Sequence, residues 1–184
     1  MITHMEPAPV PSPFRHIGIA IAEFLLLAFA LPVGGALILA IPLPAVIALI
    51  TSTLLIEYGA GPVGIGLGLD PLFVLVTITS IAAGVILLLF GIFDTLGSCS
   101  ARVRGFLDRS KQRAEQSKLL SGYGMLGLVP CVIIFGFYVC PAVSWVFSWH
   151  RRFSILLTLA GYILVSVITI LATLGIFRAF GWGA

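Results

Sequence analysis

Long apolar runs separated by short polar segments are the main pattern of the chain. Three of these runs, 17–41, 72–93 and 153–177, are long enough to cross a bilayer as single helices. A helix of the first run's length extends about 37 Å, which exceeds the ~30 Å thickness of a hydrocarbon core. The pattern therefore predicts an all-α integral membrane protein with three spanning helices.

Two further apolar stretches are interrupted by glycine and proline. The first consists of residues 45–56, a break at 57–62 and a glycine-rich piece at 63–69. The second runs over 123–140, is interrupted at Pro141 and returns over 142–149. Apolar pieces of about 10–14 residues are too short to span and are typical of re-entrant segments. Each stretch can be interpreted either as a re-entrant hairpin or as one kinked span.

The positions of the basic residues favour re-entrant hairpins. If both interrupted stretches return to the side they entered, Arg15, Arg151, Arg152 and the six Lys/Arg of residues 95–122 share one side, and Arg178 alone lies opposite. An excess of Lys/Arg marks the cytoplasmic side. We therefore expect the N-terminus and residues 95–122 in the cytoplasm, the C-terminus outside, and the protein in the plasma membrane.

This topology divides the chain into repeated units. Residues 1–13 form a Pro-rich tail that we expect to be disordered, and residues 14–184 form a single transmembrane domain. Within the domain, a hairpin followed by a span occurs at about 43–94 and again at about 123–178, in inverted orientation. The connection 95–122 is basic and is predicted to contain an amphipathic surface helix. Interrupted helices at matching positions of inverted halves indicate a transporter-like binding site.

Composition supports the membrane assignment and excludes other classes. The chain is 60% hydrophobic and 9% charged, whereas soluble domains are about 45–50% apolar and about 25% charged. A basic groove interleaved with aromatic residues is absent, so nucleic-acid binding is not expected. The three cysteines lack metal-ligand spacing, and neither a nucleophile–base pair nor a histidine cluster is apparent. The sequence thus predicts no metal, no cofactor and no enzymatic activity.

Two acidic residues inside apolar segments are candidates for substrate or ion binding. Glu57 lies at the break of the first hairpin, where an uncompensated charge costs several kcal/mol. Protonation would avoid much of that cost, which suits proton coupling; alternatively, Glu57 only caps the broken backbone. Glu23 lies within the first span. It either faces the same cavity or reaches the cytoplasmic interface.

The remaining candidates mark the hairpins and their ends. Arg151 and Arg152 are either interfacial anchors or, for one of them, a binding group for an anionic lipid headgroup. Trp145 either lines the second hairpin or belongs to an aromatic belt. Pro62 and Pro141 mark the interruptions of the two hairpins and complete the predicted substrate- or ion-binding set.

Two motifs resemble the small multidrug export proteins. The first is Glu57-Tyr-Gly-Ala-Gly-Pro-Val-Gly-Ile-Gly-Leu-Gly-Leu69, which resembles the family pattern E-L-R-G-A-I-P-L-G-I-A-L-G-L. The second is Gly122-Tyr-Gly-Met-Leu-Gly-Leu128 with Pro141 and Trp145 downstream, which resembles Y-G-x-x-G-L followed by P-G-T-G-A-W. The resemblance covers about residues 52–177.

The chain also departs from the family pattern. Tyr58 stands where the family has arginine, and Pro141-Ala-Val-Ser144 replaces the glycine-rich turn. The family is similar in turn to the DedA/VTT membrane proteins, which have re-entrant hairpins that face each other. Some of those proteins are implicated in moving lipids across membranes. The resemblance therefore implies a DedA-like arrangement and a transport function.

The sequence leads to one main functional hypothesis and one alternative. The main hypothesis is a membrane transporter or lipid translocase, proton-coupled, with a site between the two hairpins. The alternative is a non-transporting scaffold, assembly factor or lipid-binding protein. Expected partners are membrane lipids and a small-molecule or lipid substrate that the sequence does not identify. A homodimer is also expected, because three spans are few to enclose a pathway.

Overall fold

The computed structural model describes residues 13–99, 128–147 and 149–179, and nearly all of these residues are helical. No strand occurs in these three ranges. Residues 100–122 of the basic connection, where an amphipathic helix was expected, lie outside the described residues. The tail also lies outside them, except for Pro13, which begins the first helix.

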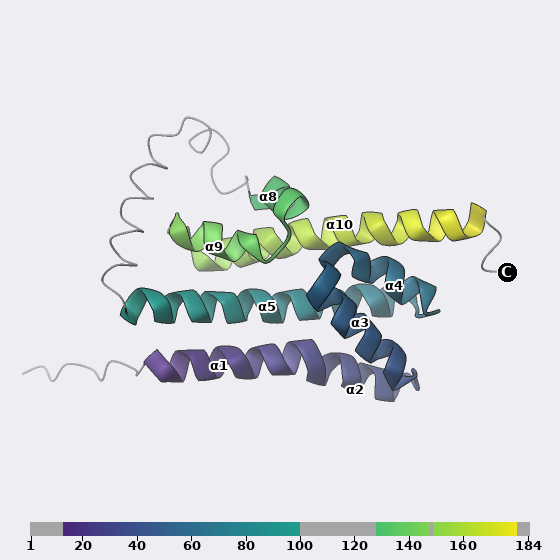
Figure 1. Cartoon of the computed structure of the whole chain (residues 1–184), viewed down its shortest axis with the longest axis horizontal. Coiled ribbons are helices and arrows are strands. Elements are labelled where there is room, and N and C mark those ends of the chain that lie inside the picture. The colour runs from purple at the N-terminus through teal and green to yellow at the C-terminus, as the bar shows by residue number, and fades with distance from the viewer. Residues whose placement is uncertain (1–12, 100–127, 148, 180–184) are drawn as a thin grey trace, which may run out of the picture.

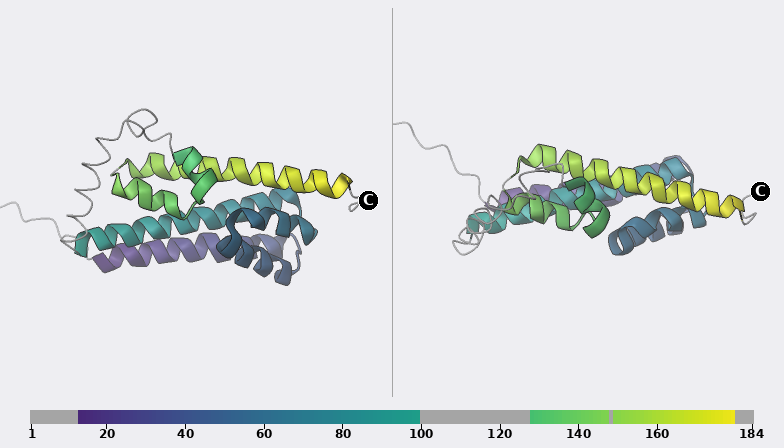
Figure 2. Two further views of the ribbon diagram at one scale, coloured as in Figure 1. Left: turned by 45° about the horizontal axis from the view of Figure 1, so that its top comes forward. Right: turned by 90° about the horizontal axis from the view of Figure 1, so that it is seen from above.

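Three long helical segments lie side by side (Figure 1). The first is continuous from α1 (Pro13–Leu25) through a π-helical turn, η1 (Leu26–Ala30), into α2 (Leu31–Ile38). The other two are α5 (Pro71–Cys99) and α10 (Arg151–Ala179). Figures 1 and 2 show α5 between the other two segments. The three long helices predicted from the sequence are therefore confirmed.

Two pairs of short helices complete the fold. The first pair is α3 (Leu43–Ile56) and α4 (Ala60–Gly66), joined by the 3-10 turn η2 (Glu57–Gly59). The second pair is α8 (Leu128–Phe135) and α9 (Val139–Val146). Figures 1 and 2 show each pair folded back on itself, α3–α4 toward one end of the long helices and α8–α9 toward the other.

By length and hydropathy, four segments of the described chain could cross a membrane. They are Ile17–Ile38, Leu43–Gly66, Pro71–Thr95 and Arg151–Ile176, with mean hydropathies of 2.2, 1.6, 2.7 and 2.5. The second of them contains the interruption at η2. Many large apolar side chains are exposed, such as Leu26 on the first segment and Leu171 on the last. An apolar exterior of this kind matches lipid rather than water.

The interruption of the second helix pair differs from the sequence prediction. The break was expected at Pro141, but the helix stops at Gly136 and restarts at Val139. Gly136 has φ 81°, a conformation that glycine adopts without steric cost. Pro141 lies inside the first turn of α9, where the missing N–H of proline breaks no helical hydrogen bond. Glycine, not proline, therefore ends α8.

A glycine allows the first helix pair to pack tightly on α5. A Cβ atom at Gly64 would lie 2.6 Å from Cγ2 of Val74 on α5 and 3.1 Å from Cδ1 of Leu49 on α3. Small residues at such positions permit close approach of helices in membranes. Because Leu49 precedes η2 and Gly64 follows it, their proximity also shows that α3 and α4 lie alongside each other.

The π-helical turn η1 leaves one carbonyl that another helix must satisfy. The N–H of Leu31 bonds to the carbonyl of Leu26, five residues earlier. With the same five-residue spacing, the carbonyl of Leu27 would accept from the N–H of residue 32. Residue 32 is proline, which has no N–H. The Ser80 hydroxyl of α5 instead donates to Leu27 at 2.6 Å. This bond connects α5 to the first segment at its irregular turn.

We expect Ser80→Ala to destabilise the protein by about 1–3 kcal/mol, because it leaves the Leu27 carbonyl without a partner in apolar surroundings. The measurement is the free energy of unfolding in mixed micelles. Thr79→Val is a matched control, since the Thr79 hydroxyl is buried and has no hydrogen-bond partner among the described residues. The explanation of the π-helical turn is wrong if Ser80→Ala is no less stable than Thr79→Val.

Candidate functional site

The interruptions of the two helix pairs contact each other. The Tyr58 hydroxyl, in η2, donates to the Val132 carbonyl of α8. The Tyr138 hydroxyl, in the turn between α8 and α9, donates to the Leu54 carbonyl of α3 at 2.7 Å. We call the two turns, residues 57–59 and 136–138, the hairpin tips. Each tip therefore supplies one tyrosine to the other helix pair.

Helix ends explain why these carbonyls accept a side-chain hydrogen bond. The last four carbonyls of a helix have no partner within the helix. Leu54 and Val132 lie in the last turns of α3 and α8. Val132 also accepts the Gly136 N–H at 2.9 Å, which closes the turn. The tyrosine bonds thus reach carbonyls at the helix ends, and at Val132 the Tyr58 bond adds to the helical one.

Glu57 points from the first tip into the second. Its carboxylate faces the backbone N–H of Phe137 in the second tip. A Cβ atom built on Gly136 would overlap the Glu57 carboxylate. Gly136 therefore provides both the positive φ that ends α8 and the space that the carboxylate occupies. The Glu57 side chain is half-buried at this contact.

The two tips share a local pattern. Glu57 and Gly136 both have positive φ, 52° and 81°. Each is followed five residues later by proline, Pro62 in α4 and Pro141 in α9. Positive φ in a non-glycine residue costs roughly 1–3 kcal/mol and persists only where the surroundings impose it. The strained residue of the first tip is thus the one whose carboxylate contacts the second tip.

Tyr162 of α10 packs against both tips. Its side chain is fully buried. Its ring centroid lies 4.9 Å from that of Phe137 and 5.9 Å from that of Tyr58. Tyr162 was not among the residues predicted from the sequence, although a single tyrosine within the apolar run 153–177 is the signal that could have identified it. A buried tyrosine usually places its hydroxyl near a partner.

Buried hydroxyl groups continue along α10 on both sides of Tyr162. They occur at intervals of four or seven residues, so that they share one face of the helix. The buried members are Ser154, Thr158, Tyr162, Ser166 and Thr173. Within the described part of the chain, the Ser154 hydroxyl has no hydrogen-bond partner, and Tyr162 and Ser166 have none beyond each other. Buried polar groups of this kind are commonly satisfied by water.

Two cysteines lie in the second helix pair close to the tips. The Cys140 thiol donates to the Gly136 carbonyl at 3.4 Å. Cys131 interacts with Cys140 across the pair. In the described ranges, no group of three or more His, Cys, Asp or Glu side chains is arranged to hold a metal ion. The two thiols pack within the second helix pair.

The structure places Pro62 and Pro141 beside the tips and Glu23 elsewhere. Pro62 and Pro141 lie in the first turns of α4 and α9. Glu23 is exposed on α1, close in sequence to the exposed Ile19 and Leu26. The elements that form the tips are α3, η2, α8 and α9, so Glu23 does not join Glu57.

The candidate residues of the second half lie at the beginning of α10. Arg151 forms an ion pair with Asp94 of α5, with Nη1 and Oδ2 2.9 Å apart, and its guanidinium lies 5.6 Å from the Phe90 ring centroid. Arg152 is exposed. Arg151 precedes Tyr162 by eleven residues, or about 16 Å of helix. These arginines therefore lie apart from the tips.

Trp145 connects α9 to α5 rather than entering the tips. Its ring stacks on that of Phe93, with the centroids 5.5 Å apart. On α5, Phe93 directly precedes Asp94 of the Arg151–Asp94 ion pair. Together the two contacts fasten the second helix pair and the start of α10 to α5.

We expect Gly136→Ala to destabilise the protein by several kcal/mol, since the new Cβ would overlap the Glu57 carboxylate at a strained φ. Gly68→Ala is the matched control, because Gly68 has φ 76° but nothing within 4 Å of its Cβ position. The thermal midpoint in detergent is the measurement. Equal losses in the two variants would contradict the proposed fit of Glu57 against Gly136.

A known protein family matches the part of the chain that contains both tips. Residues 57–168, more than half of the chain, match the sequence profile of the family described as putative small multi-drug export protein. The matched segment begins at Glu57 and includes both tips and Tyr162. No curated protein and no solved structure matches the chain. The resemblance inferred from the two sequence motifs is confirmed: the chain is a multi-pass membrane protein and belongs to the small multi-drug export family.

Proposed function

We propose that this protein is a membrane transporter whose substrate or coupling proton passes the contact between the two hairpin tips. The observation that carries the proposal is Glu57, an acidic residue with strained backbone whose carboxylate is held by the opposite tip. Backbone strain and ionisable groups at membrane depth concentrate at functional sites.

In the proposed topology, both helix pairs are re-entrant hairpins. The helices α3 and α4 have 14 and 7 residues, and α8 and α9 have 8 each. These lengths correspond to at most about 21 Å of helix, less than a ~30 Å hydrocarbon core. The two pairs then enter from opposite sides, as inverted repeats with a DedA-like arrangement. The basic connection lies in the cytoplasm of a plasma-membrane protein, and the C-terminus lies outside.

Glu57 gives the contact between the tips a chemical switch. As a carboxylate it can accept from the Phe137 N–H that it faces. A protonated carboxyl group is a weaker acceptor and carries its own donor, so protonation weakens this link. The tyrosine bonds to Val132 and Leu54 would then hold the tips alone. Proton binding thereby biases the tips toward separation, which is what proton-coupled transport requires.

The buried hydroxyls of α10 offer a route for that proton. They extend from Ser154 to Thr173 along one face of the helix, with Tyr162 at the tips. Water that pairs with the hydroxyl of Ser154 would start a hydrogen-bonded file toward Glu57. The cargo is either a lipid or a small molecule.

A non-transporting scaffold or lipid-binding protein is the second candidate function. It is favoured by the direct tyrosine bonds between the tips, which close the contact. It is also favoured by the ion pair between Arg151 and Asp94, which occupies a group otherwise suited to an anionic headgroup. This candidate requires only that the tips remain together.

Liposome transport with two probes tests the proposal. Protein in liposomes is expected to move either a fluorescent phospholipid between leaflets or a lipophilic dye across the membrane, the latter in response to a pH gradient. We expect Glu57→Gln to reduce the rate at least tenfold, because the amide cannot bind and release a proton. Glu23→Gln, on the exposed face of α1, is the matched control and is expected to retain the rate.

Two outcomes would contradict the proposal in different ways. Movement of neither probe above that in protein-free liposomes would leave the scaffold as the supported function. Movement that is unchanged in Glu57→Gln and also in Arg151→Ala would retain transport but reject these residues as its site.

A homodimer is the quaternary state that we propose. A carboxylate that faces lipid costs several kcal/mol, and Glu23 is exposed among apolar residues of α1. A second copy packed on α1 would cover it. In a cysteine-free background, Ile19→Cys on α1 is then expected to form a disulfide-linked dimer in bilayers. Ile168→Cys on α10, similarly exposed, is the control. Recovery of only monomers with both variants would exclude a dimer through α1.

A further inference from the structure

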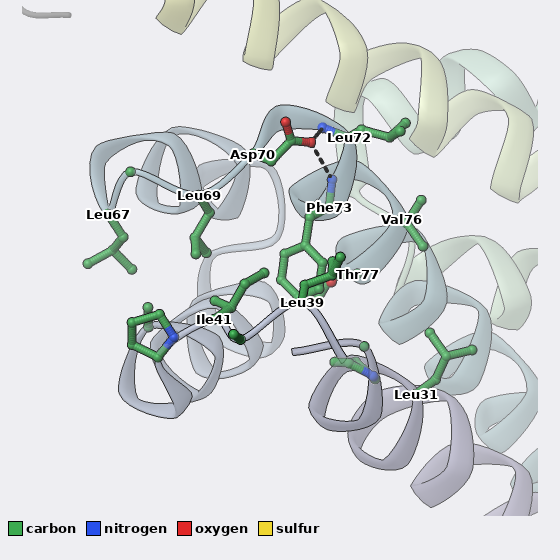
Figure 3. A pocket seen from close by; sticks show the side chains of 16 residues that line it. Leu31, Leu39, Ile41, Leu67, Leu69, Asp70, Leu72, Phe73, Val76 and Thr77 are labelled. Carbon is green, nitrogen blue, oxygen red and sulfur yellow. Dashed lines mark hydrogen bonds between the residues drawn. The ribbon is translucent and has the colours of Figure 1, made fainter. Parts of the chain in front are cut away.

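An apolar cavity lies at the base of the first helix pair, at the opposite end of that pair from its tip. Its volume is about 890 Å³, within the range of small-molecule sites. It is bounded by α2, the turn that follows α2, the connection between α4 and α5, and the first two turns of α5. Figure 3 shows Ile41, Leu69, Phe73 and Leu31 around it.

Asp70 is the charged residue of this cavity. The other fifteen lining residues, all in the described part of the chain, are uncharged and mostly aliphatic. Asp70 Oδ1 accepts hydrogen bonds from the backbone N–H groups of Leu72 and Phe73, at 2.9 and 3.2 Å (Figure 3). Both bonds use the same oxygen, and Oδ2 has no partner among the described residues. The carboxylate thus caps α5 and retains an oxygen that can accept from a ligand.

The position of Asp70 relative to the membrane suits the head of an amphiphile. The apolar segment of α5 that could span a membrane begins at Pro71, the next residue. Asp70 is exposed, whereas Thr77, two turns further into α5, is buried. The cavity therefore has its carboxylate at the interface end and its aliphatic wall along the hydrocarbon.

Electrostatics select the kind of ligand. Lipid tails are as apolar as the cavity wall, so transfer from lipid into the cavity provides little selectivity by itself. A carboxylate attracts a cation and disfavours an anionic head. Neither lysine nor arginine lines the cavity to offset this preference.

We propose that this cavity binds an amphiphile with an alkyl chain and an ammonium head, the chain along α2 and α5 and the ammonium group at Asp70. The ammonium group belongs either to a lipid headgroup or to a single-chain amine. Because the cavity and the tips lie at opposite ends of the first helix pair, this proposal does not depend on transport at the tips.

Photolabelling of the full chain in nanodiscs tests the proposal. The probes are a diazirine-bearing alkyltrimethylammonium and an alkyl sulfate of the same chain length. Peptides that contain residues 39–45 and 67–77 are expected to be labelled at least fivefold more by the ammonium probe. Asp70→Asn is expected to abolish this preference while the protein retains its stability, since asparagine also caps helices.

Controls separate the proposed site from general contact with lipid. Glu23→Gln removes another exposed carboxylate and is expected to leave the labelling unchanged. Ala45→Phe is expected to fill the cavity and reduce labelling by both probes. Competition by phosphatidylethanolamine would identify a lipid headgroup as the natural ligand, and competition by a single-chain alkylamine alone would identify a free amine. Equal labelling by the two probes, or a preference that survives in Asp70→Asn, would overturn the proposal.

Discussion

Interrupted helices within an apolar environment leave backbone groups that water cannot reach. An unsatisfied carbonyl or N–H in lipid costs several kcal/mol. In this protein the two interruptions satisfy each other, since Tyr58 donates to Val132 and Tyr138 donates to Leu54. These two bonds link the helix pairs at their tips, although the Val132 carbonyl also accepts the Gly136 N–H within its own pair.

The long helices hold the two tips in contact with each other. The central helix α5 contacts the first segment, both members of the first helix pair, α9 and α10. Close packing at Gly64 fixes α4 on α5, and the stack of Trp145 on Phe93 fixes α9 on the same helix. Because α5 positions one helix of each pair, movement of one tip relative to the other requires either sliding along α5 or bending within a pair.

The contact between the tips combines a rigid frame with one ionisable group. Aromatic rings of Tyr58, Phe137 and Tyr162 pack against one another beside it. The Glu57 carboxylate is the part whose hydrogen bonding changes when a proton binds. The cavity at the base of the same helix pair is lined mostly by aliphatic side chains, and Asp70 at its edge is the one charged residue among the described residues that line it. The two ends of the first helix pair thus differ in chemical character.

The sequence by itself determined the long helices and the location of the first interruption, and it singled out Glu57 as a candidate. Periodic runs of apolar residues and their lengths are local properties, so 17–41, 72–93 and 153–177 could be assigned without any contact information. The first break was predicted at 57–62 and occurs at 57–59. The second was placed at Pro141 because proline is the usual helix breaker, whereas Gly136 ends the helix.

Tertiary structure alone decided which residues meet at the tips. Tyr58 and Val132 are 74 residues apart, and Tyr138 and Leu54 are 84 apart. No local pattern encodes such pairs, because a tyrosine hydroxyl can satisfy any free carbonyl within reach. The same holds for Tyr162, and for Arg151, whose partner Asp94 lies on another helix. The sequence thus identified the broken helices, and the packing of α5 and α10 determined that the breaks face each other across Gly136 and Glu57.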